Sequence, residues 1–267
     1  MAGPDVARPH RDRHYLIWVS SQSVRSSSTS VRLGPVAFMQ AVLPAVIRDR
    51  NGAGALLQSP CTSMLRLYRF PYSTNVDRVA LALAHKGLAV ESVVIDPADR
   101  TPLREVSGQD LVPVLVDGTQ VVIDSTRIMR HLEQRNPEPP LFPAEPAARA
   151  EVEVFLDWFN RAWKREPNLI AAAIERGEPE NEDIARWGDR LQRRLELFEG
   201  LLTGRDHLFG AFGAADCAAW PFLRYAVHIE PDDDEVFHQV LHERMVLGDG
   251  HANLRAWIER VGTRPTV

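Results

Sequence analysis

The first folded part of the chain alternates between strand-like and helix-like patterns. Apolar side chains recur at helical spacing between two strand-like runs, Leu65–Tyr68 and Val90–Ile95. Gly87 follows the helical pattern at the place where a left-handed glycine commonly ends a helix. This order predicts two parallel strands joined by a right-handed crossover. Asp96–Gly108 holds two prolines and predicts an irregular stretch with a short helix at Leu103–Val106.

A β-hairpin that leads directly into a helix is predicted next. Leu111–Val116 and Val121–Ile123 are rich in β-branched residues and flank a turn at Asp117–Gly118. Asp124 or Ser125 can cap the helix that follows, because both side chains accept hydrogen bonds from N–H groups of a first helical turn. Together these patterns predict a βαβαββα unit.

The chain then changes to a purely helical character. Five prolines within residues 136–146 predict a linker. We therefore divide the folded part into an α/β domain (64–136), a linker (137–148) and an all-α domain (149–267). Amphipathic helical patterns in the second domain cover Arg149–Lys164, Asn181–Leu202, Asp216–His228 and Ala252–Val261.

Residues 1–63 show no sustained hydrophobic period and contain a serine-rich tract. Three interpretations are open. The segment is a non-native extension, with natural translation starting at Met64, or it is a disordered tail, or it is a targeting segment, although Asp5 and Asp12 interrupt the pattern of a transit peptide.

Bulk composition narrows the class of protein. Of the 267 residues, 45% are hydrophobic and 25% charged, which is typical of globular proteins, and no apolar run reaches the length of a membrane helix. The net charge is −5, and arginines outnumber acids in residues 1–63, so the acidic excess lies in the folded part and argues against nucleic-acid binding. Two cysteines, Cys61 and Cys217, form no disulfide framework and suit a reducing cytoplasm.

Three sequence pieces, in this order and spacing, resemble the glutathione S-transferase family. They are LRLYRFPYSTNVDRVALALAHKGL (Leu65–Leu88), Val112-Pro113-Val114-Leu115 and the pair Asp124-Ser125. The resemblance implies a thioredoxin-like α/β domain followed by an all-α helical bundle domain, as the patterns also predict.

The resemblance also implies roles for individual residues. The Val112-Pro113 peptide is expected to be cis and to present the backbone of Val112 to the cysteinyl part of glutathione. Asp124 and Ser125 are expected to start a helix that holds the γ-glutamyl carboxylate. The acidic residue here is Asp where the family commonly has Glu or Gln, so another low-molecular-weight thiol is an alternative to glutathione as co-substrate.

Ser73 is the catalytic candidate. It follows the first strand and precedes a helix amino terminus, where N–H groups and the helix dipole favour an anion. In the resembling family a hydroxyl at this position hydrogen-bonds the glutathione sulfur. Tyr72 and Thr74 are alternative sources of the hydroxyl, and Asn75 is a candidate to assist. The competing interpretation of Ser73 is an ordinary helix cap.

The acceptor site in such folds lies against the first helices of the all-α domain. Four aromatic side chains on the first predicted helix are candidates for its wall, with core packing as the alternative for each. They are Phe155, Trp158, Phe159 and Trp163.

Two further patterns concern a metal site and a helix cap. His238 and His242 are four residues apart, but no third ligand accompanies them, so we predict no metal site and expect a solvated acidic loop at Asp232–Glu235. Gly213 stands where a capping box has Ser or Thr, with Asp216 three residues later, so one of the two reciprocal hydrogen bonds should be lost.

The expected function is a cytoplasmic, homodimeric, glutathione S-transferase-like detoxification enzyme that activates a thiol for attack on a small hydrophobic electrophile. One alternative is a non-catalytic scaffold of the same fold that binds ligands or proteins. A second is a thiol-dependent isomerase or dehalogenase.

Overall fold

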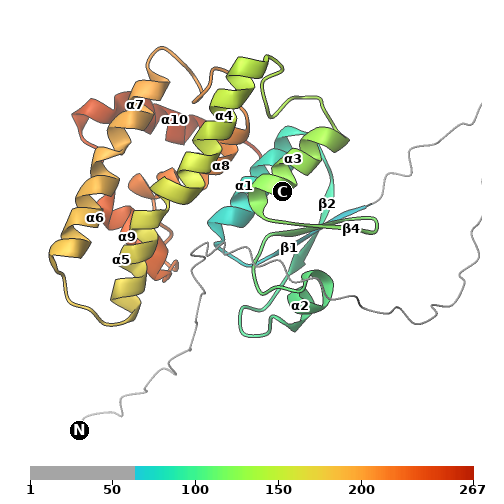
Figure 1. Cartoon of the computed structure of the whole chain (residues 1–267), viewed down its shortest axis with the longest axis horizontal. Helices are drawn as coiled ribbons and strands as arrows, with labels where there is room; N and C mark the ends of the chain where they lie inside the picture. Colours follow the sequence, from blue (N-terminus) through green and yellow to red (C-terminus); the bar gives the residue numbers. More distant parts are fainter. Residues whose placement is uncertain (1–63) are drawn as a thin grey trace, which may run out of the picture. The chain divides into compact units, whose positions relative to one another are not determined.

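The computed structural model describes residues 64–267, so the interpretations of residues 1–63 lie outside its range (Figure 1). The first domain follows the predicted order of strands and helices. Its elements are β1 (Leu65–Arg69), α1 (Thr74–His85), β2 (Val90–Val94), α2 (Thr101–Ser107), β3 (Val114–Asp117), β4 (Gln120–Ile123) and α3 (Ser125–Arg135).

The four strands form one mixed sheet in the order β2-β1-β3-β4. β1 pairs parallel with β2, and Leu65 lies opposite Val90. β3 pairs antiparallel with β1 and with β4. Gly87 takes a left-handed φ of 62° just after α1, as the sequence predicts. The βαβαββα arrangement is therefore confirmed.

The two faces of the sheet are covered by different helices. Leu67 and Leu115 point to one face and join the core that contains α1 and α3. Tyr68 and Val114 point to the other face and pack around Leu103 of α2. This division follows from the alternation of side chains along a strand. Figure 1 shows α1 and α3 on one side of the sheet and α2 on the other.

The second domain is helical throughout. It contains α4 (Pro146–Trp158), the π-helical turn η1 (Phe159–Trp163), α5 (Arg165–Glu175), α6 (Glu182–Arg193), α7 (Leu195–Leu202), α8 (Ala214–Leu223), the 3-10 turn η2 (Arg224–Ala226), α9 (Val236–Arg244), the 3-10 turn η3 (Asp249–His251) and α10 (Ala252–Gly262).

Two predicted helical spans are wrong in detail. The span Arg149–Lys164 is α4 followed by the π-helical turn, and α4 begins earlier, at Pro146. The span Asn181–Leu202 is two helices that meet at Arg194. The Arg194 side chain turns back to donate a hydrogen bond to the carbonyl of Ala162 (2.9 Å). The chain from Arg165 to Glu175 forms a helix that the sequence patterns did not predict.

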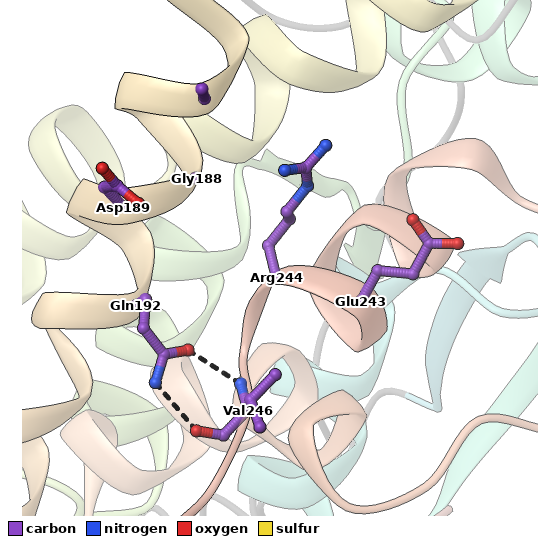
Figure 2. A pocket seen from close by; sticks show the side chains of 7 residues that line it. Gly188, Asp189, Gln192, Glu243, Arg244 and Val246 are labelled. Atoms are coloured by element: carbon purple, nitrogen blue, oxygen red, sulfur yellow. Dashed lines mark hydrogen bonds between the residues drawn. The ribbon is translucent and has the colours of Figure 1, made fainter. Parts of the chain in front are cut away.

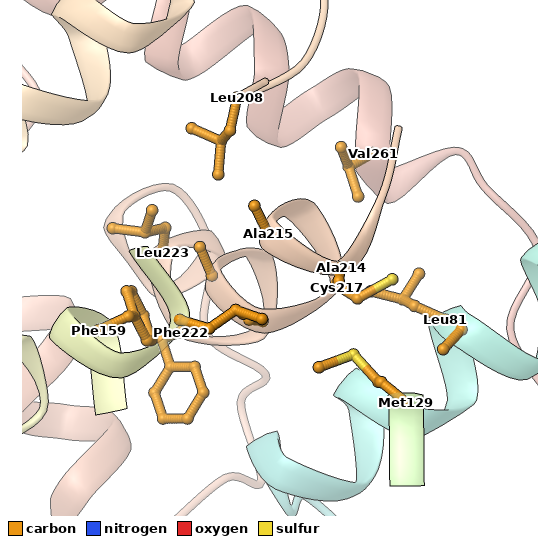
Figure 3. Packing of buried hydrophobic residues seen from close by; sticks show 14 of the residues in the cluster. Leu81, Met129, Phe159, Leu208, Ala214, Ala215, Cys217, Phe222, Leu223 and Val261 are labelled. Carbon is orange, nitrogen blue, oxygen red and sulfur yellow. The ribbon is translucent and has the colours of Figure 1, made fainter. Parts of the chain in front are cut away.

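α8 lies at the centre of the core that the two domains share (Figure 3). Its buried side chains contact Leu81 of α1 and Met129 of α3 on one side and Phe159 on the other. Because one hydrophobic core joins these elements, the start of α1 is held in a fixed relation to the helical domain.

Gly213 and Asp216 form half of a capping box, as predicted. The Gly213 N–H donates to Asp216 Oδ2 (3.0 Å), and the reciprocal bond is missing because glycine has no side chain. The reason for the glycine is steric. A Cβ atom on Gly213 would lie 2.6 Å from the carbonyl oxygen of Leu141, which accepts a hydrogen bond from Ala214 N (2.7 Å).

We predict that Gly213→Ser destabilises the protein rather than completing the box. The added Cβ must displace the Leu141 carbonyl, and such overpacking typically costs about 1–3 kcal/mol. Urea denaturation measures the change in the free energy of unfolding. Gly200→Ala is the matched control, because open space surrounds that helical glycine, and it should raise stability by roughly 0.5–1 kcal/mol. A Gly213→Ser protein at least as stable as wild type would contradict the prediction.

Candidate functional site

The start of α1 carries the predicted catalytic serine. Ser73 is the N-cap residue, and its carbonyl accepts from the N–H groups of Val76 (2.9 Å) and Asp77 (3.0 Å). Its hydroxyl makes no capping bond to the helix. Because a serine at this position ordinarily spends its hydroxyl on the first turn, the Ser73 side chain is left available for a ligand.

The three alternative candidates beside Ser73 are either hydrogen-bonded to other residues or buried. The Tyr72 hydroxyl donates its single proton to Asp232 Oδ2 (2.8 Å), and this hydrogen bond raises the pKa of Tyr72. Thr74 is buried. The side-chain oxygen of Asn75 accepts from Lys164 Nζ (3.1 Å). Of the four candidates, Ser73 is therefore the one whose hydroxyl is both accessible and uncommitted among the described residues.

The predicted thiol-binding elements lie where the sequence placed them. The Val112-Pro113 peptide is cis, as expected. Asp124 is the N-cap of α3, and its carboxylate accepts from Arg127 N (3.0 Å). Ser125 is the first residue of that helix and is buried. Their roles toward a ligand stay predictions.

Two non-glycine residues have a positive φ angle in residues 64–267. They are Tyr72 (φ 58°) and Asp124 (φ 73°). Asp124 is the N-cap residue of α3, and Tyr72 precedes Ser73, the N-cap residue of α1. Unfavourable backbone conformations persist only where the surrounding structure holds them, and they are concentrated at functional sites. Their position supports a site between the starts of α1 and α3.

Arg78 connects this site to the helical domain. Its side chain is 1% exposed and donates from Nε to the carbonyl of Ala218 in α8 (2.9 Å). Nη1 donates to Asn160 Oδ1 (2.7 Å) and to Ser125 Oγ (3.4 Å), whereas buried Nη2 has no hydrogen-bond partner. Burial lowers the pKa of Arg78 to about 9, so the guanidinium is still charged at neutral pH.

Lys164 is a second cation beside the start of α1. It follows the π-helical turn, and its amine lies 4.7 Å from the centre of the Phe222 ring. The guanidinium carbon of Arg78 lies at the same distance from that ring. Burial, and then repulsion from Arg78, lower the pKa of Lys164 well below its usual value. Two basic side chains, Arg78 and Lys164, therefore act on each other at the site, together with the carboxylate of Asp124.

The four aromatic acceptor candidates do not form a common wall. Phe155, Phe159 and Trp163 are buried in the shared core, and Phe159 stacks on Trp163 with ring centres 4.5 Å apart. Trp158 is the partly exposed member of the set. The structure therefore assigns three of the candidates to packing and leaves Trp158 as the acceptor candidate.

Sequence analysis missed Arg78, Asn160 and Lys164 as members of the site. One signal was present, since Arg78 lies directly before the apolar run Val79–Leu83 of α1. Lys164 is one of two lysines in a chain that uses arginine elsewhere. The position of Asn160 follows from the π-helical turn, a feature that is frequent at functional sites and has no clear sequence pattern.

The predicted histidine pair serves structural contacts. His238 Nδ1 lies 2.9 Å from the carboxylate of Asp233, and His242 Nδ1 lies 2.8 Å from the carbonyl of Tyr225. Asp233 is buried, so the expectation of a solvated acidic loop is wrong for this residue. In residues 64–267 no group of three or more His, Cys, Asp or Glu side chains is arranged to hold a metal ion. Within the same range no helix is long and apolar enough to cross a bilayer.

A shallow pocket between α6 and α9 lies apart from this site (Figure 2). Gln192 forms two hydrogen bonds with the backbone of Val246 there, both 2.8 Å long. Arg244 pairs with Glu180 at 2.7 Å. Because these polar groups satisfy one another, the pocket offers few free contacts for a ligand.

Comparison with known proteins identifies two domain families in the chain. The N-terminal domain of glutathione S-transferase matches residues 67–140, and the C-terminal domain of glutathione S-transferase matches residues 181–260. Glutathione S-transferase 3 of Zea mays is 30% identical over 217 residues, which cover 75% of this chain and 90% of that protein.

Two further relatives show the range of the family. FtsZ-localized protein A of Caulobacter vibrioides is 30% identical over 166 residues, which cover 57% of this chain and 73% of that protein. The crystal structure of a tau-class glutathione S-transferase from mango matches with a TM-score of 0.64 and 20% identity, over 77% of this chain and 91% of that one, and this likeness supports the fold alone. Both halves of the chain, and the fold that they form, lead to one conclusion: the protein belongs to the glutathione S-transferase family.

Proposed function

We propose that the protein is a thiol transferase that binds glutathione, or another low-molecular-weight thiol, and activates its sulfur at Ser73 for attack on an electrophile. The observation that carries this proposal is the Ser73 hydroxyl, which stands at a helix amino terminus and caps nothing. In this proposal the backbone of Val112 holds the cysteinyl part of the thiol, and Ser125 at the start of α3 holds its γ-glutamyl carboxylate.

The energies are consistent with activation by these groups. A free thiol has a pKa near ~8.5, so a mostly ionised thiol at neutral pH needs a pKa lower by about 2 units, or ~2.7 kcal/mol. A hydrogen bond from one hydroxyl contributes about 0.5–1.5 kcal/mol, and a helix amino terminus contributes up to ~2 kcal/mol. The positive charge of Arg78 favours the thiolate further.

Two finer points of the proposal follow from the family. We infer a cytoplasmic homodimer whose partners are a small thiol and a small electrophile, without nucleic acid or membrane. A thiol-dependent isomerase or dehalogenase would use the same activated sulfur, and it differs in the electrophile rather than in the residues named here.

A second candidate function is a non-catalytic scaffold. The observation that favours it is the similarity to a relative whose name refers to localisation with FtsZ rather than to a transferase reaction. A thermal-shift panel of glutathione and other cellular thiols separates the candidates. Stabilisation by one thiol supports the enzyme, and no response to any thiol supports the scaffold.

We predict that Ser73→Ala lowers turnover at neutral pH by roughly 10-fold or more, the equivalent of ~1.4 kcal/mol. Without the hydroxyl the pKa of the bound thiol rises, so a smaller fraction is thiolate and the pH–rate profile moves to higher pH. Steady-state rates between pH 5 and 9 measure this shift.

Ser125→Ala is the matched control, because it removes a hydroxyl from the start of α3 rather than α1. It should weaken thiol binding more than it changes the pKa of the bound thiol. Turnover that is insensitive to Ser73→Ala would transfer the catalytic role to Tyr72 or Thr74. Absence of both turnover and thiol binding in wild type would leave the scaffold.

A further inference from the structure

Two cations at the site, the buried Arg78 and the partly buried Lys164, form no direct ion pair in the described part of the chain. Arg78 and Lys164 both lie 4.7 Å from the centre of the Phe222 ring, and repulsion from Arg78 lowers the pKa of Lys164, so the two charges act on each other. Among residues 64–267, neither forms an ion pair with a carboxylate, and their hydrogen-bond partners are neutral oxygens. The carboxylate of Asp124 raises the pKa of both cations without a direct contact, and it offsets part of the cost of their burial. Buried Nη2 of Arg78 still has no hydrogen-bond partner, so the arrangement favours a bound anion.

The other lysine of the chain shows the contrast. Lys86 Nζ donates to the carboxylate of Glu133 (2.7 Å) and to the carbonyls of Asn136 (2.6 Å) and Pro139 (2.9 Å). An ammonium has three donors, so the amine of Lys86 is fully used. Lys164 has one acceptor, Asn75, and two of its three donors are left for a ligand.

Lys164 lies beside the start of α1 rather than the start of α3. Its contact with Asn75 lies in the first turn of α1, next to Ser73, whereas Arg78 reaches Ser125 at the start of α3. The aromatic side chains expected to form a hydrophobic acceptor wall are mostly buried in the core. The π-helical turn and the residue after it therefore place two polar groups beside α1, the amide of Asn160 and the amine of Lys164.

We propose that Lys164 determines the acceptor specificity and that the electrophile carries a carboxylate. This inference rests on the proposed thiol transfer at Ser73 and replaces the expected hydrophobic electrophile with an anionic one. Burial and then repulsion from Arg78 lower the pKa of Lys164, and Asp124 offsets this only in part, so Lys164 has no directly bound counter-ion among residues 64–267. A bound carboxylate would supply it and would accept the two free N–H groups.

The test compares an electrophile that carries a carboxylate with its methyl ester, which has no charge. In 4-chloro-3,5-dinitrobenzoate and its methyl ester, the thiolate sulfur of glutathione forms a bond to the ring carbon while the carbon–chlorine bond breaks. Chloride leaves with the bonding electron pair, and the proton of the thiol passes to the solvent. We expect full-length wild type to prefer the carboxylate.

The decisive variant is Lys164→Met, which removes the charge and keeps the chain length. We expect it to lower kcat/KM for the carboxylate by about 10-fold or more and to leave the ester nearly unchanged, because hydrogen bonds to charged groups are strong. Lys164→Arg should retain the preference. The control is Arg165→Met, which removes an exposed charge one residue further and should leave the ratio of the two rates unchanged.

A binding measurement separates this inference from the proposed function. Calorimetry with 3,5-dinitrobenzoate and its methyl ester, which have no leaving group, needs no turnover. The inference is supported if wild type binds the carboxylate more tightly than the ester and a folded Lys164→Met protein loses this difference. This holds even if both chloro compounds are inert, an outcome that would count against the proposed thiol transfer instead. Equal binding, no binding, or a rate ratio that Lys164→Met does not change overturns the inference.

Discussion

Replacing Asp216 with alanine should lower the free energy of unfolding by about 3–5 kcal/mol, because it leaves buried donors without an acceptor. The carboxylate is fully buried. Oδ1 accepts from Leu208 N (3.1 Å) and from Trp257 Nε1 (2.8 Å), and Oδ2 accepts from Gly213 N (3.0 Å). One side chain thus joins the loop before α8, the start of α8 and the last helix. Urea denaturation followed by circular dichroism measures the loss.

Asp216→Asn should cost less, because the amide keeps one accepting oxygen and loses the other. Asp206→Ala is the control, since that carboxylate is highly exposed and lies 3.7 Å from Arg260, and it should change stability by no more than about 0.5 kcal/mol. If Asp216→Ala costs no more than Asp206→Ala, the three hydrogen bonds do not hold the helical domain together.

The α/β domain follows from local patterns. Alternation in β1 and β3, the left-handed Gly87 and the capping residue Asp124 each point to one structure over a few residues, and they agree with one another. Such local signals predict the strands, their order and the site of α3. The cis peptide at Pro113 was implied by the family resemblance and by the place of a proline inside a β-rich run.

The helical domain shows where local patterns fail. α5 opens with Arg165, Glu166 and Pro167, which look like the end of the preceding helix, although a proline in the first turn is compatible with a helix start. The boundary between α6 and α7 falls at Arg194, whose side chain pairs with Glu166 on α5. That contact joins residues 28 apart in the sequence, so a reading of short windows does not detect it.

The candidate site was predictable only where local sequence patterns define it. Ser73 and Ser125 stand at helix starts, which sequence rules identify. Two features mark Arg78 and Lys164 as site residues. Neither forms an ion pair with a carboxylate among residues 64–267, and both lie near the ring of Phe222. A missing partner is visible only when the surroundings are known in three dimensions.

Trp163→Ala should destabilise the protein by about 3–5 kcal/mol, whereas Trp158→Ala should cost roughly 1 kcal/mol. Trp163 is fully buried, stacks on Phe159 and meets Phe198 and Phe222 edge-on, with ring centres 6.2 and 6.1 Å away. The cavity left by the lost indole cannot close without moving these rings. Trp158 is partly exposed, so its removal leaves no comparable cavity.

The same two variants decide which tryptophan serves the acceptor site. Urea denaturation gives the stability change, and the KM for the electrophile gives the effect on acceptor binding. Trp158→Ala should raise KM while the fold remains stable, and Trp163→Ala should act first on stability because its ring belongs to the core that holds α8. A stable Trp163→Ala protein with a raised KM would return Trp163 to the acceptor wall. It would also show that the rings around Phe159 repack without cost.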